Sequence, residues 1–280
     1  MNSPEIITGL SRIAGEYDAL ICDVWGVVHN GVSAYLPAVD ALRRFREARG
    51  RVVLLTNAPR PPSGVEGQLR DFGVPRDCYD SVVTSGGAAR ASLARLAEEC
   101  RLPVMHLGPE RDTGLFQGLE VELCGADKAA VVLCSGLFDD DNETPEHYRE
   151  ALSEMKARDL TMICANPDVV VQRGGKLVHC AGGLARAYEE IGGRVAYYGK
   201  PHAPIYEMTL EAAGNPGRPL VIGDGLETDI RGANLAGIDA LFVTQGIHAE
   251  ELGRLTPENL ATLLDRRGVH ARAAIEALAW

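Results

Sequence analysis

Residues 19–26 read Ala19-Leu-Ile-Cys-Asp-Val-Trp-Gly26, and they give the first indication of the fold. The segment opens with a short, continuous apolar run, which is typical of a strand buried on both faces of a parallel sheet. Asp23 ends this run shortly before a glycine turn. Because ligands of open α/β sheets bind beyond the carboxyl ends of the strands, Asp23 is a candidate functional residue.

Apolar strands alternate with helical patterns on either side of this segment and again near the C-terminus. Residues 36–49 repeat apolar side chains at helical spacing, and Gly50 stands where a helix would stop. Further strands are expected at 51–56, 81–84, 104–107, 129–134, 161–164, 195–198, 219–222 and 239–244, and further helices at 202–213 and 226–236. This alternation predicts an α/β fold with a parallel sheet covered by helices.

Three other segments carry polar side chains close to predicted strands. Thr56 and Asn57 end the run Leu54-Leu-Thr-Asn57, and Lys200 lies in the turn Gly199-Lys-Pro201. The third segment, Val221-Ile-Gly-Asp-Gly-Leu-Glu-Thr-Asp229, supplies two acids. Each piece alone is ordinary, since an aspartate at a strand end usually serves a turn or a helix cap. Their occurrence together and in this order is much less expected by chance.

The acids at 23, 224 and 229 would repel one another if they met in one pocket, so such a pocket requires cations. One Mg²⁺ together with the ammonium of Lys200 would neutralise the three carboxylates, and Mg²⁺ favours carboxylates, waters and substrate phosphate. An Asp23 oxygen could then attack phosphorus and form an aspartyl-phosphate. Lys200 and Thr56 would hold the phosphoryl oxygens.

These motifs resemble the haloacid dehalogenase superfamily of hydrolases with an aspartate nucleophile, in particular its class IIA branch of nucleotide, sugar-phosphate, pyridoxal-phosphate and phosphoglycolate phosphatases. The resemblance rests on Asp23-Val-Trp-Gly26, Leu54-Leu-Thr-Asn57, Tyr198-Gly-Lys-Pro201, Gly223-Asp-Gly-Leu-Glu-Thr-Asp229 and Ala165-Asn-Pro-Asp-Val169. It implies a Rossmann-like core formed by residues 1–84 and 195–280. Residues 85–194 would form an inserted α/β cap domain.

The resemblance also implies roles for individual residues. Asp23 would be the nucleophile and a Mg²⁺ ligand, joined by the backbone carbonyl of Trp25 and by Asp224 and Asp229. Thr56, Asn57 and Lys200 would bind phosphate. The residues of the cap that would face the substrate are Asn166, Asp168, Gly182 and Gly183.

Trp25 departs from the phosphatase pattern, which has a second aspartate two residues after the nucleophile. That aspartate would protonate the leaving group and later activate water, and general acid–base catalysis is worth about 10²–10⁴-fold in rate. Indole cannot replace it, because its N–H does not titrate in the relevant range. A substitute could come from His29, Asp168 or His179, or the substrate could carry a good leaving group.

The sequence therefore supports a small-metabolite phosphomonoesterase whose activity Trp25 limits or narrows. One alternative is a sensor protein that binds a phosphorylated ligand with little turnover. A second is a dehalogenase-type hydrolase, because the superfamily's dehalogenases resemble this chain in having an aromatic residue at this position. Phosphate release, ligand-induced thermal stabilisation without turnover, and halide release in EDTA respectively distinguish the three.

Composition and charge narrow the partners. The 280 residues are 46% hydrophobic and 24% charged, as in an ordinary globular protein. A net charge of −11 disfavours nucleic acid and anionic membranes as partners.

The seven cysteines are odd in number and lack C-x-x-C spacing, so we expect reduced thiols in a cytoplasmic protein. The resemblance further suggests a homodimer formed through the cap. The acids at 139–141 are expected to lie in a solvated loop.

Overall fold

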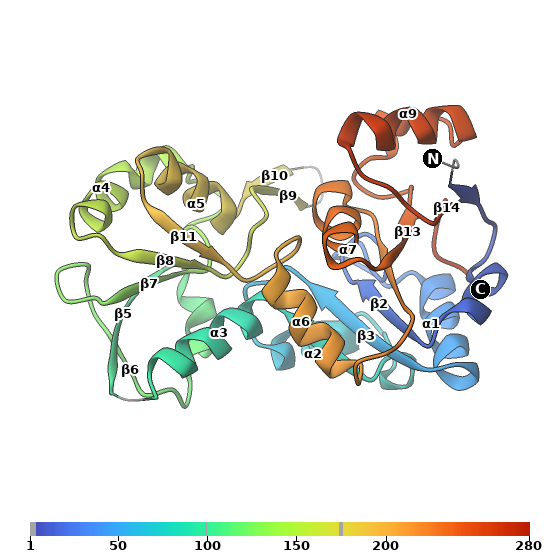
Figure 1. Cartoon of the computed structure of the whole chain (residues 1–280). Coiled ribbons are helices and arrows are strands. Elements are labelled where there is room, and N and C mark those ends of the chain that lie inside the picture. The colour runs from blue at the N-terminus through green and yellow to red at the C-terminus, as the bar shows by residue number, and fades with distance from the viewer. Residues whose placement is uncertain (1–3, 99, 174–175) are drawn as a thin grey trace. The chain divides into compact units, whose positions relative to one another are not determined.

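The computed structural model describes residues 4–98, 100–173 and 176–280. The chain forms two compact units (Figure 1). The first comprises Met1–Thr56, Glu66–Val83 and Lys200–Trp280, and the second comprises Asn57–Val65 and Thr84–Gly199. Each unit has its own sheet, so each is described separately. The predicted fold class, an α/β protein with a parallel-sheet core and an inserted α/β unit, is confirmed.

The first unit is built on a seven-stranded sheet. Its strands, in spatial order, are β1 (Glu5–Ile6), β14 (Ala273–Ile275), β13 (Asp239–Val243), β12 (Pro219–Gly223), β2 (Ala19–Asp23), β3 (Arg51–Thr56) and β4 (Ser81–Thr84). The central strands pair in parallel, with Cys22 opposite both Ile222 and Leu54. Every residue of β2 is buried, as its continuous apolar run predicts.

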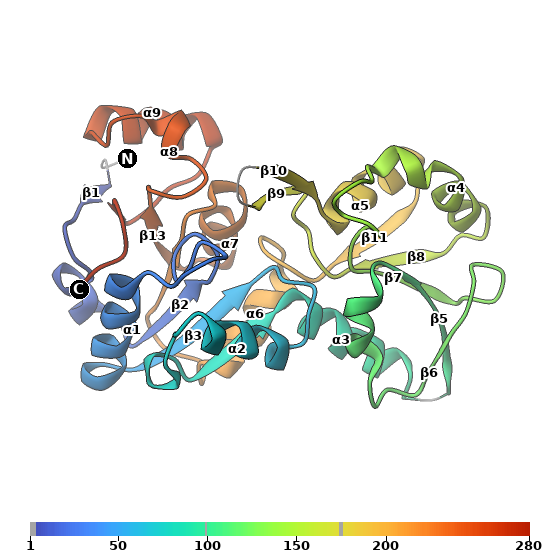
Figure 2. The same cartoon turned by 180° about the vertical axis from the view of Figure 1, so that it is seen from behind.

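Helices cover both faces of this first sheet. Helix α1 (Leu36–Ala48) lies on one face, and α6 (Ala203–Ala212) and α7 (Arg231–Ala236) lie on the other, as the two opposite views show (Figures 1 and 2). The unit also contains α8 (Ala249–Leu252), α9 (Pro257–Arg267) and the second half of α2 (Pro62–Asp71). The predicted helix at 226–236 begins as a π-helical turn, Leu226–Ile230, before continuing as α7.

The second unit is built on a five-stranded parallel sheet. Its order is β11 (Arg194–Tyr197), β8 (Thr161–Cys164), β7 (Val131–Cys134), β5 (Leu102–Leu107) and β6 (Val121–Leu123). Helices α4 (Arg149–Ala157) and α5 (Ala181–Glu190) pack on one face, and α3 (Ser85–Leu96) packs on the other. Strands β9 (Val170–Arg173) and β10 (Lys176–His179) form a separate antiparallel pair.

Strand β11 differs from the sequence-based assignment. The sequence pattern and the family resemblance predict residues 195–198 at the start of the second core segment. In the structure, β11 instead pairs in parallel with β8 along its whole length, from Arg194 opposite Thr161 to Tyr197 opposite Cys164. An apolar strand pattern carries no information about which of two parallel sheets will accept the strand, so the pattern alone could not have placed it.

Candidate active site

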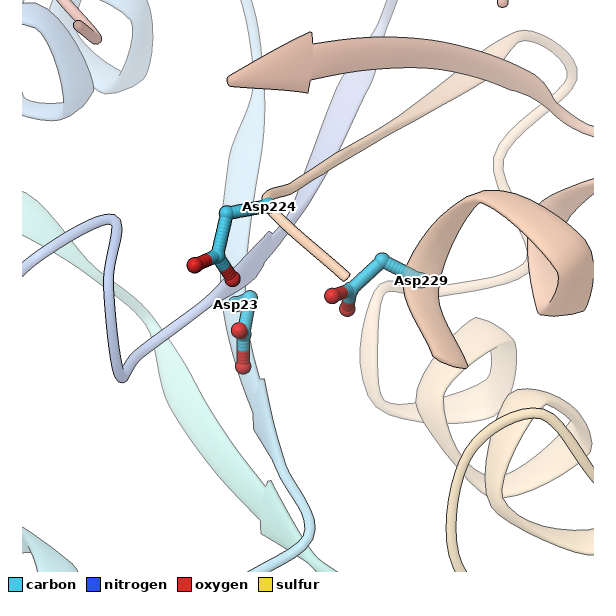
Figure 3. Close-up of side chains that lie close together, drawn as sticks. All are labelled: Asp23, Asp224 and Asp229. Carbon is cyan, nitrogen blue, oxygen red and sulfur yellow. The ribbon is translucent and has the colours of Figure 1, made fainter. Parts of the chain in front are cut away.

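Three carboxylates converge at the carboxyl edge of the first sheet (Figure 3). Asp23 is the last residue of β2, Asp224 directly follows β12, and Asp229 lies in the π-helical turn after it. Each offers an oxygen within 4.8 Å of the others, and all three side chains belong to buried residues. The convergence predicted from the sequence is therefore present, because adjacent parallel strands end at the same edge of the sheet.

Lys200 completes this cluster. Its Nζ donates hydrogen bonds to Asp23 Oδ1 at 2.6 Å and to Asp229 Oδ1 at 2.7 Å, and the residue is only 3% exposed. Burial alone would lower the pKa of Lys200, but the adjoining carboxylates of Asp229 and Asp23 hold it well above its usual value. Lys200 is therefore a fixed cation of the site rather than a base.

Backbone groups orient the other two acids. Asp229 Oδ2 accepts a hydrogen bond from the Gly225 N–H at 3.1 Å, and Asp224 Oδ2 accepts one from the Ile247 N–H at 3.0 Å. Gly26 approaches Asp224 so closely that a Cβ added there would lie 2.3 Å from Oδ2, and its φ of +83° also favours glycine. The glycine after Trp25 is thus a requirement for placing Asp224.

The charge of the cluster is unbalanced without a cation. Burial, together with the neighbouring Asp229, raises the pKa of Asp23 well above its usual value and that of Asp224 to about 7. Three ionised carboxylates against one ammonium leave two uncompensated negative charges in a buried place. A single divalent cation would balance them, and a set of carboxylate oxygens suits Mg²⁺. The residues present therefore fit the metal that the sequence predicts.

Trp25 lies in the loop that leaves β2. The indole is half-buried and meets the His29 ring edge-on, with centroids 5.5 Å apart. His29 is 1% exposed, and its Nδ1 accepts a hydrogen bond from the Gly31 N–H at 3.0 Å. Burial lowers the pKa of His29 to about 4, so the ring is neutral at physiological pH, with its proton on Nε2.

Two of the predicted phosphate-binding residues, Thr56 and Asn57, are consecutive in the sequence. Thr56 is the buried last residue of β3. Asn57 is the first residue of the second unit, where its Nδ2 donates a hydrogen bond to Asp168 Oδ1 at 2.8 Å.

Asp168 also forms hydrogen bonds with two of the other predicted cap residues. Its N–H donates to Asn166 Oδ1 at 3.0 Å, and its carbonyl oxygen accepts from the Gly182 N–H at 3.0 Å. The Gly183 N–H donates to the carbonyl of Cys180, one turn away at the start of α5. These residues therefore share one neighbourhood inside the second unit. Their role toward a substrate stays a prediction.

Two contributions to the site were not anticipated. The Ile247 N–H that holds Asp224 belongs to the loop after β13, where a Cβ on Gly246 would lie 1.9 Å from Asp224 Oδ2. Tyr206 in α6 donates its hydroxyl hydrogen to the Asp229 carbonyl at 3.2 Å. Gly246, which follows β13 closely in the sequence, indicates a turn there. No residue pattern, however, predicts that this turn contacts Asp224.

The acids at 139–141 lie in a largely exposed loop of the second unit, as expected. Asp140 pairs with Arg111, and Asp141 pairs with Lys176. These ion pairs compensate two of the three acids, while Asp139 accepts hydrogen bonds from Asn142 and from the Asp141 N–H. Among the described residues, no helix combines the length and the apolar character needed to cross a membrane.

An open parallel sheet with three buried acids and a lysine at its carboxyl edge defines a Rossmann-like α/β protein with a cation-requiring acidic site. Family models agree with this description. The model described as haloacid dehalogenase-like hydrolase matches residues 20–122, and that described as HAD-hydrolase-like matches residues 197–266.

Similar proteins of known structure support the same assignment. A haloacid dehalogenase-like hydrolase from Brucella suis 1330 is 42% identical over 98% of this chain and 100% of its own, with a TM-score of 0.85. The chain belongs to the haloacid dehalogenase-like hydrolases, within the class IIA branch.

Relatives with named activities are more distant. The D-glycerol 3-phosphate phosphatase of Mycobacterium tuberculosis is 29% identical over 86% of this chain. The chain spans only 66% of the length of that relative. A structure of glycerol phosphate phosphatase Rv1692 from the same organism, in complex with magnesium, is 26% identical with a TM-score of 0.68, covering 88% of this chain and 74% of its own.

Proposed function

We propose that this protein is a Mg²⁺-dependent hydrolase that removes phosphate from a small phosphorylated metabolite, with Asp23 as its nucleophile. The observation that carries the proposal is the buried cluster of Asp23, Asp224 and Asp229 with Lys200 held between two of these acids. The named activity of the M. tuberculosis relative and the magnesium in the Rv1692 structure support it.

The residues of the chain divide the work between them. A carboxylate oxygen of Asp23 attacks phosphorus, the bond to the leaving oxygen breaks, and an acyl phosphate forms on Asp23. Water then attacks that phosphorus, which releases inorganic phosphate and restores the carboxylate. Lys200 and the hydroxyl of Thr56 bind phosphoryl oxygens, and Asn57 assists.

Mg²⁺ would be held by Asp23, Asp224, Asp229 and the backbone carbonyl of Trp25. When bound, it neutralises charge on the carboxylates and on the phosphoryl group. Lys200 contributes a fixed positive charge before substrate arrives, because its ammonium is already held by Asp23 and Asp229. That preorganisation lowers the cost of bringing a phosphate dianion beside three acids.

The test is phosphate release from a broad panel of phosphorylated metabolites at millimolar Mg²⁺. Asp23→Asn is the matched control, since it keeps the size of the side chain and removes the nucleophile. We expect release by the wild type that the variant and EDTA both abolish. Equal background release by the wild type and Asp23→Asn across the panel would defeat the proposal.

A phosphate-binding sensor is the second candidate function. Trp25 favours it, because the position two residues after the nucleophile holds no proton donor of the required pKa. Thermal stabilisation by Mg²⁺ plus a phosphorylated metabolite, without turnover, would identify a sensor. The dehalogenase alternative predicts halide release that persists in EDTA.

Two further expectations belong with the proposal. The seven free cysteines support a reducing, cytoplasmic location. A homodimer formed through the second unit is expected from the family resemblance, and light scattering of the purified chain tests it.

A further inference from the structure

Trp25 is built into the loop beside the nucleophile as a packing element. Its ring lies against Gly31, where an added Cβ would come within 2.4 Å of the indole Cη2. His29 meets the indole edge-on on one side and Phe72 on the other, with centroid distances of 5.5 and 4.9 Å. The indole therefore packs against the turn at residues 29–31.

Hydrogen bonds close the same loop. The Gly26 N–H donates to the His29 carbonyl at 2.8 Å, and the His29 N–H donates to the Val24 carbonyl at 3.1 Å. The Gly31 N–H donates to His29 Nδ1, so this ring nitrogen is engaged in holding the turn. His29 is thus a buried part of the loop framework: it is 1% exposed and its Nδ1 accepts from the Gly31 N–H, so it does not present a protonated ring to a substrate.

The remaining charged groups of the cluster are committed as well. Lys200 donates to Asp23 and Asp229, while Asp224 and Asp229 accept backbone hydrogen bonds and are the metal-binding acids of the proposed function. Among the described residues of this cluster and its supporting loop, none is left to protonate a leaving oxygen, and the other two candidates, Asp168 and His179, belong to the second unit. The lack of a proton donor therefore restricts which substrates the site can hydrolyse.

We propose that this site acts on phosphoryl groups whose leaving oxygen departs as a stable anion, as in acyl phosphates and phosphoanhydrides, rather than on alkyl phosphate monoesters. This inference rests on the proposed function and names its substrate class. An alkoxide is a very basic leaving group, so its departure gains most from a general acid. A carboxylate or phosphate leaving group is weakly basic and gains little.

The bond changes balance without a protein acid. The Asp23 oxygen forms a bond to phosphorus, and the electron pair of the breaking P–O bond leaves with a carboxylate or phosphate oxygen that needs no proton at neutral pH. The resulting aspartyl-phosphate is itself an acyl phosphate. Water can therefore attack its phosphorus and expel the Asp23 carboxylate, while the proton of the water passes to the released phosphate or to solvent.

The experiment measures kcat/KM for a series of substituted phenyl phosphates, acetyl phosphate and glycerol phosphate, with Mg²⁺ present. This ratio reports the first irreversible step, in which the leaving group departs. We expect kcat/KM of the wild type to fall steeply as the leaving group becomes more basic. A shallow dependence, with glycerol phosphate hydrolysed nearly as well as nitrophenyl phosphate, would show that another acid serves the site and would overturn the inference.

A pair of variants isolates the missing proton donor. Trp25→Asp and Trp25→Asn both remove the indole and are nearly equal in size, but only aspartate can transfer a proton. We expect Trp25→Asp to exceed Trp25→Asn by about 10²–10⁴-fold in kcat/KM for glycerol phosphate, and by only a few-fold for nitrophenyl phosphate. Equal ratios for both substrates would count against the inference.

The two proposals fail differently. If neither acyl, aryl nor alkyl phosphates are hydrolysed above the Asp23→Asn background, the proposed hydrolase function fails and the substrate class falls with it. If alkyl phosphates are hydrolysed readily by the wild type, the hydrolase stands and only the substrate class is wrong. Should both Trp25 variants unfold, the wild-type series alone still decides.

Discussion

Replacing Lys200 by methionine tests whether the ammonium holds the acid cluster together. Methionine keeps much of the length of the side chain and removes its charge. Lys200 makes two buried, charge-assisted hydrogen bonds, to Asp23 at 2.6 Å and to Asp229 at 2.7 Å. Hydrogen bonds to charged groups contribute about 1.5–3 kcal/mol each, so the pair contributes about 3–6 kcal/mol.

An independent comparison gives a slightly narrower range. Removing one partner of a buried ion pair costs about 3–5 kcal/mol, because the remaining charge stays buried without compensation. For a chain of this size, each kcal/mol lowers Tm by about 2 °C, so we expect a decrease of about 6–10 °C. The measurement is thermal unfolding of the metal-free protein in EDTA, followed by circular dichroism.

Lys176→Met is the matched control. Lys176 pairs with Asp141 at 3.5 Å, but both side chains are more than half exposed. Exposed ion pairs contribute about 0–1 kcal/mol, so this variant should unfold close to the wild-type temperature. If Lys200→Met loses no more stability than Lys176→Met, the buried ammonium does not compensate the acids and the electrostatic account of the site is wrong.

Asp224, His29 and Gly26 each give a further expectation that can be measured. Because the pKa of Asp224 is raised to about 7, the folded metal-free protein retains a proton that the unfolded chain releases at lower pH. The stability of the metal-free protein should therefore fall as pH rises toward 7. Stabilisation by Mg²⁺ should grow over the same pH range, because Mg²⁺ binds ionised carboxylates. Measurements of Tm with and without Mg²⁺ test both trends. The pKa of His29 is lowered to about 4, so the unfolded chain gains the proton first and stability should fall as pH drops from about 6.5 toward 4, by up to about 3 kcal/mol. His29→Asn, which keeps a hydrogen-bond acceptor near Nδ1, should remove this part of the acid sensitivity in urea titrations, and an unchanged pH profile would contradict the assignment. Gly26→Ala should cost about 1–3 kcal/mol from its positive φ alone and should also displace Asp224, so weaker Mg²⁺ binding by calorimetry is expected, and an unimpaired Mg²⁺ affinity would be the contrary result.

The sequence was most informative where strands are buried on both faces. Residues 51–56 and 161–164 were predicted as strands with the bounds that β3 and β8 have in the structure. The convergence of Asp23, Asp224 and Asp229 was also predictable, since a parallel topology brings the ends of β2 and β12 to one edge. Both successes depend on strong local patterns combined with a simple topological rule.

Strand pairings and contacts between distant segments were harder to predict from the sequence. The antiparallel pair β9 and β10 was not predicted, although the sequence places Gly174-Gly175, a recognised hairpin signal, between the two strand-forming runs. The sheet that β11 joins depends on its pairing with β8, and the backbone donor for Asp224 comes from Ile247, in a loop after another strand. Such contacts are set by the packing of segments distant in sequence, so residue patterns do not specify them.

Trp25 and Lys200 together show how the site divides stability from reactivity. Lys200 satisfies two acids before any cation or substrate binds, which reduces the electrostatic cost of folding a buried acidic cluster. Trp25 stabilises the adjoining loop through Gly31 and His29, at a position where a second titratable acid would add a further buried charge. The indole packs against the loop and cannot transfer a proton. The same side chain therefore stabilises the loop and restricts the site to substrates with weakly basic leaving groups. A variant that restores an acid at position 25 should therefore gain turnover of basic leaving groups and lose stability of the loop at the same time.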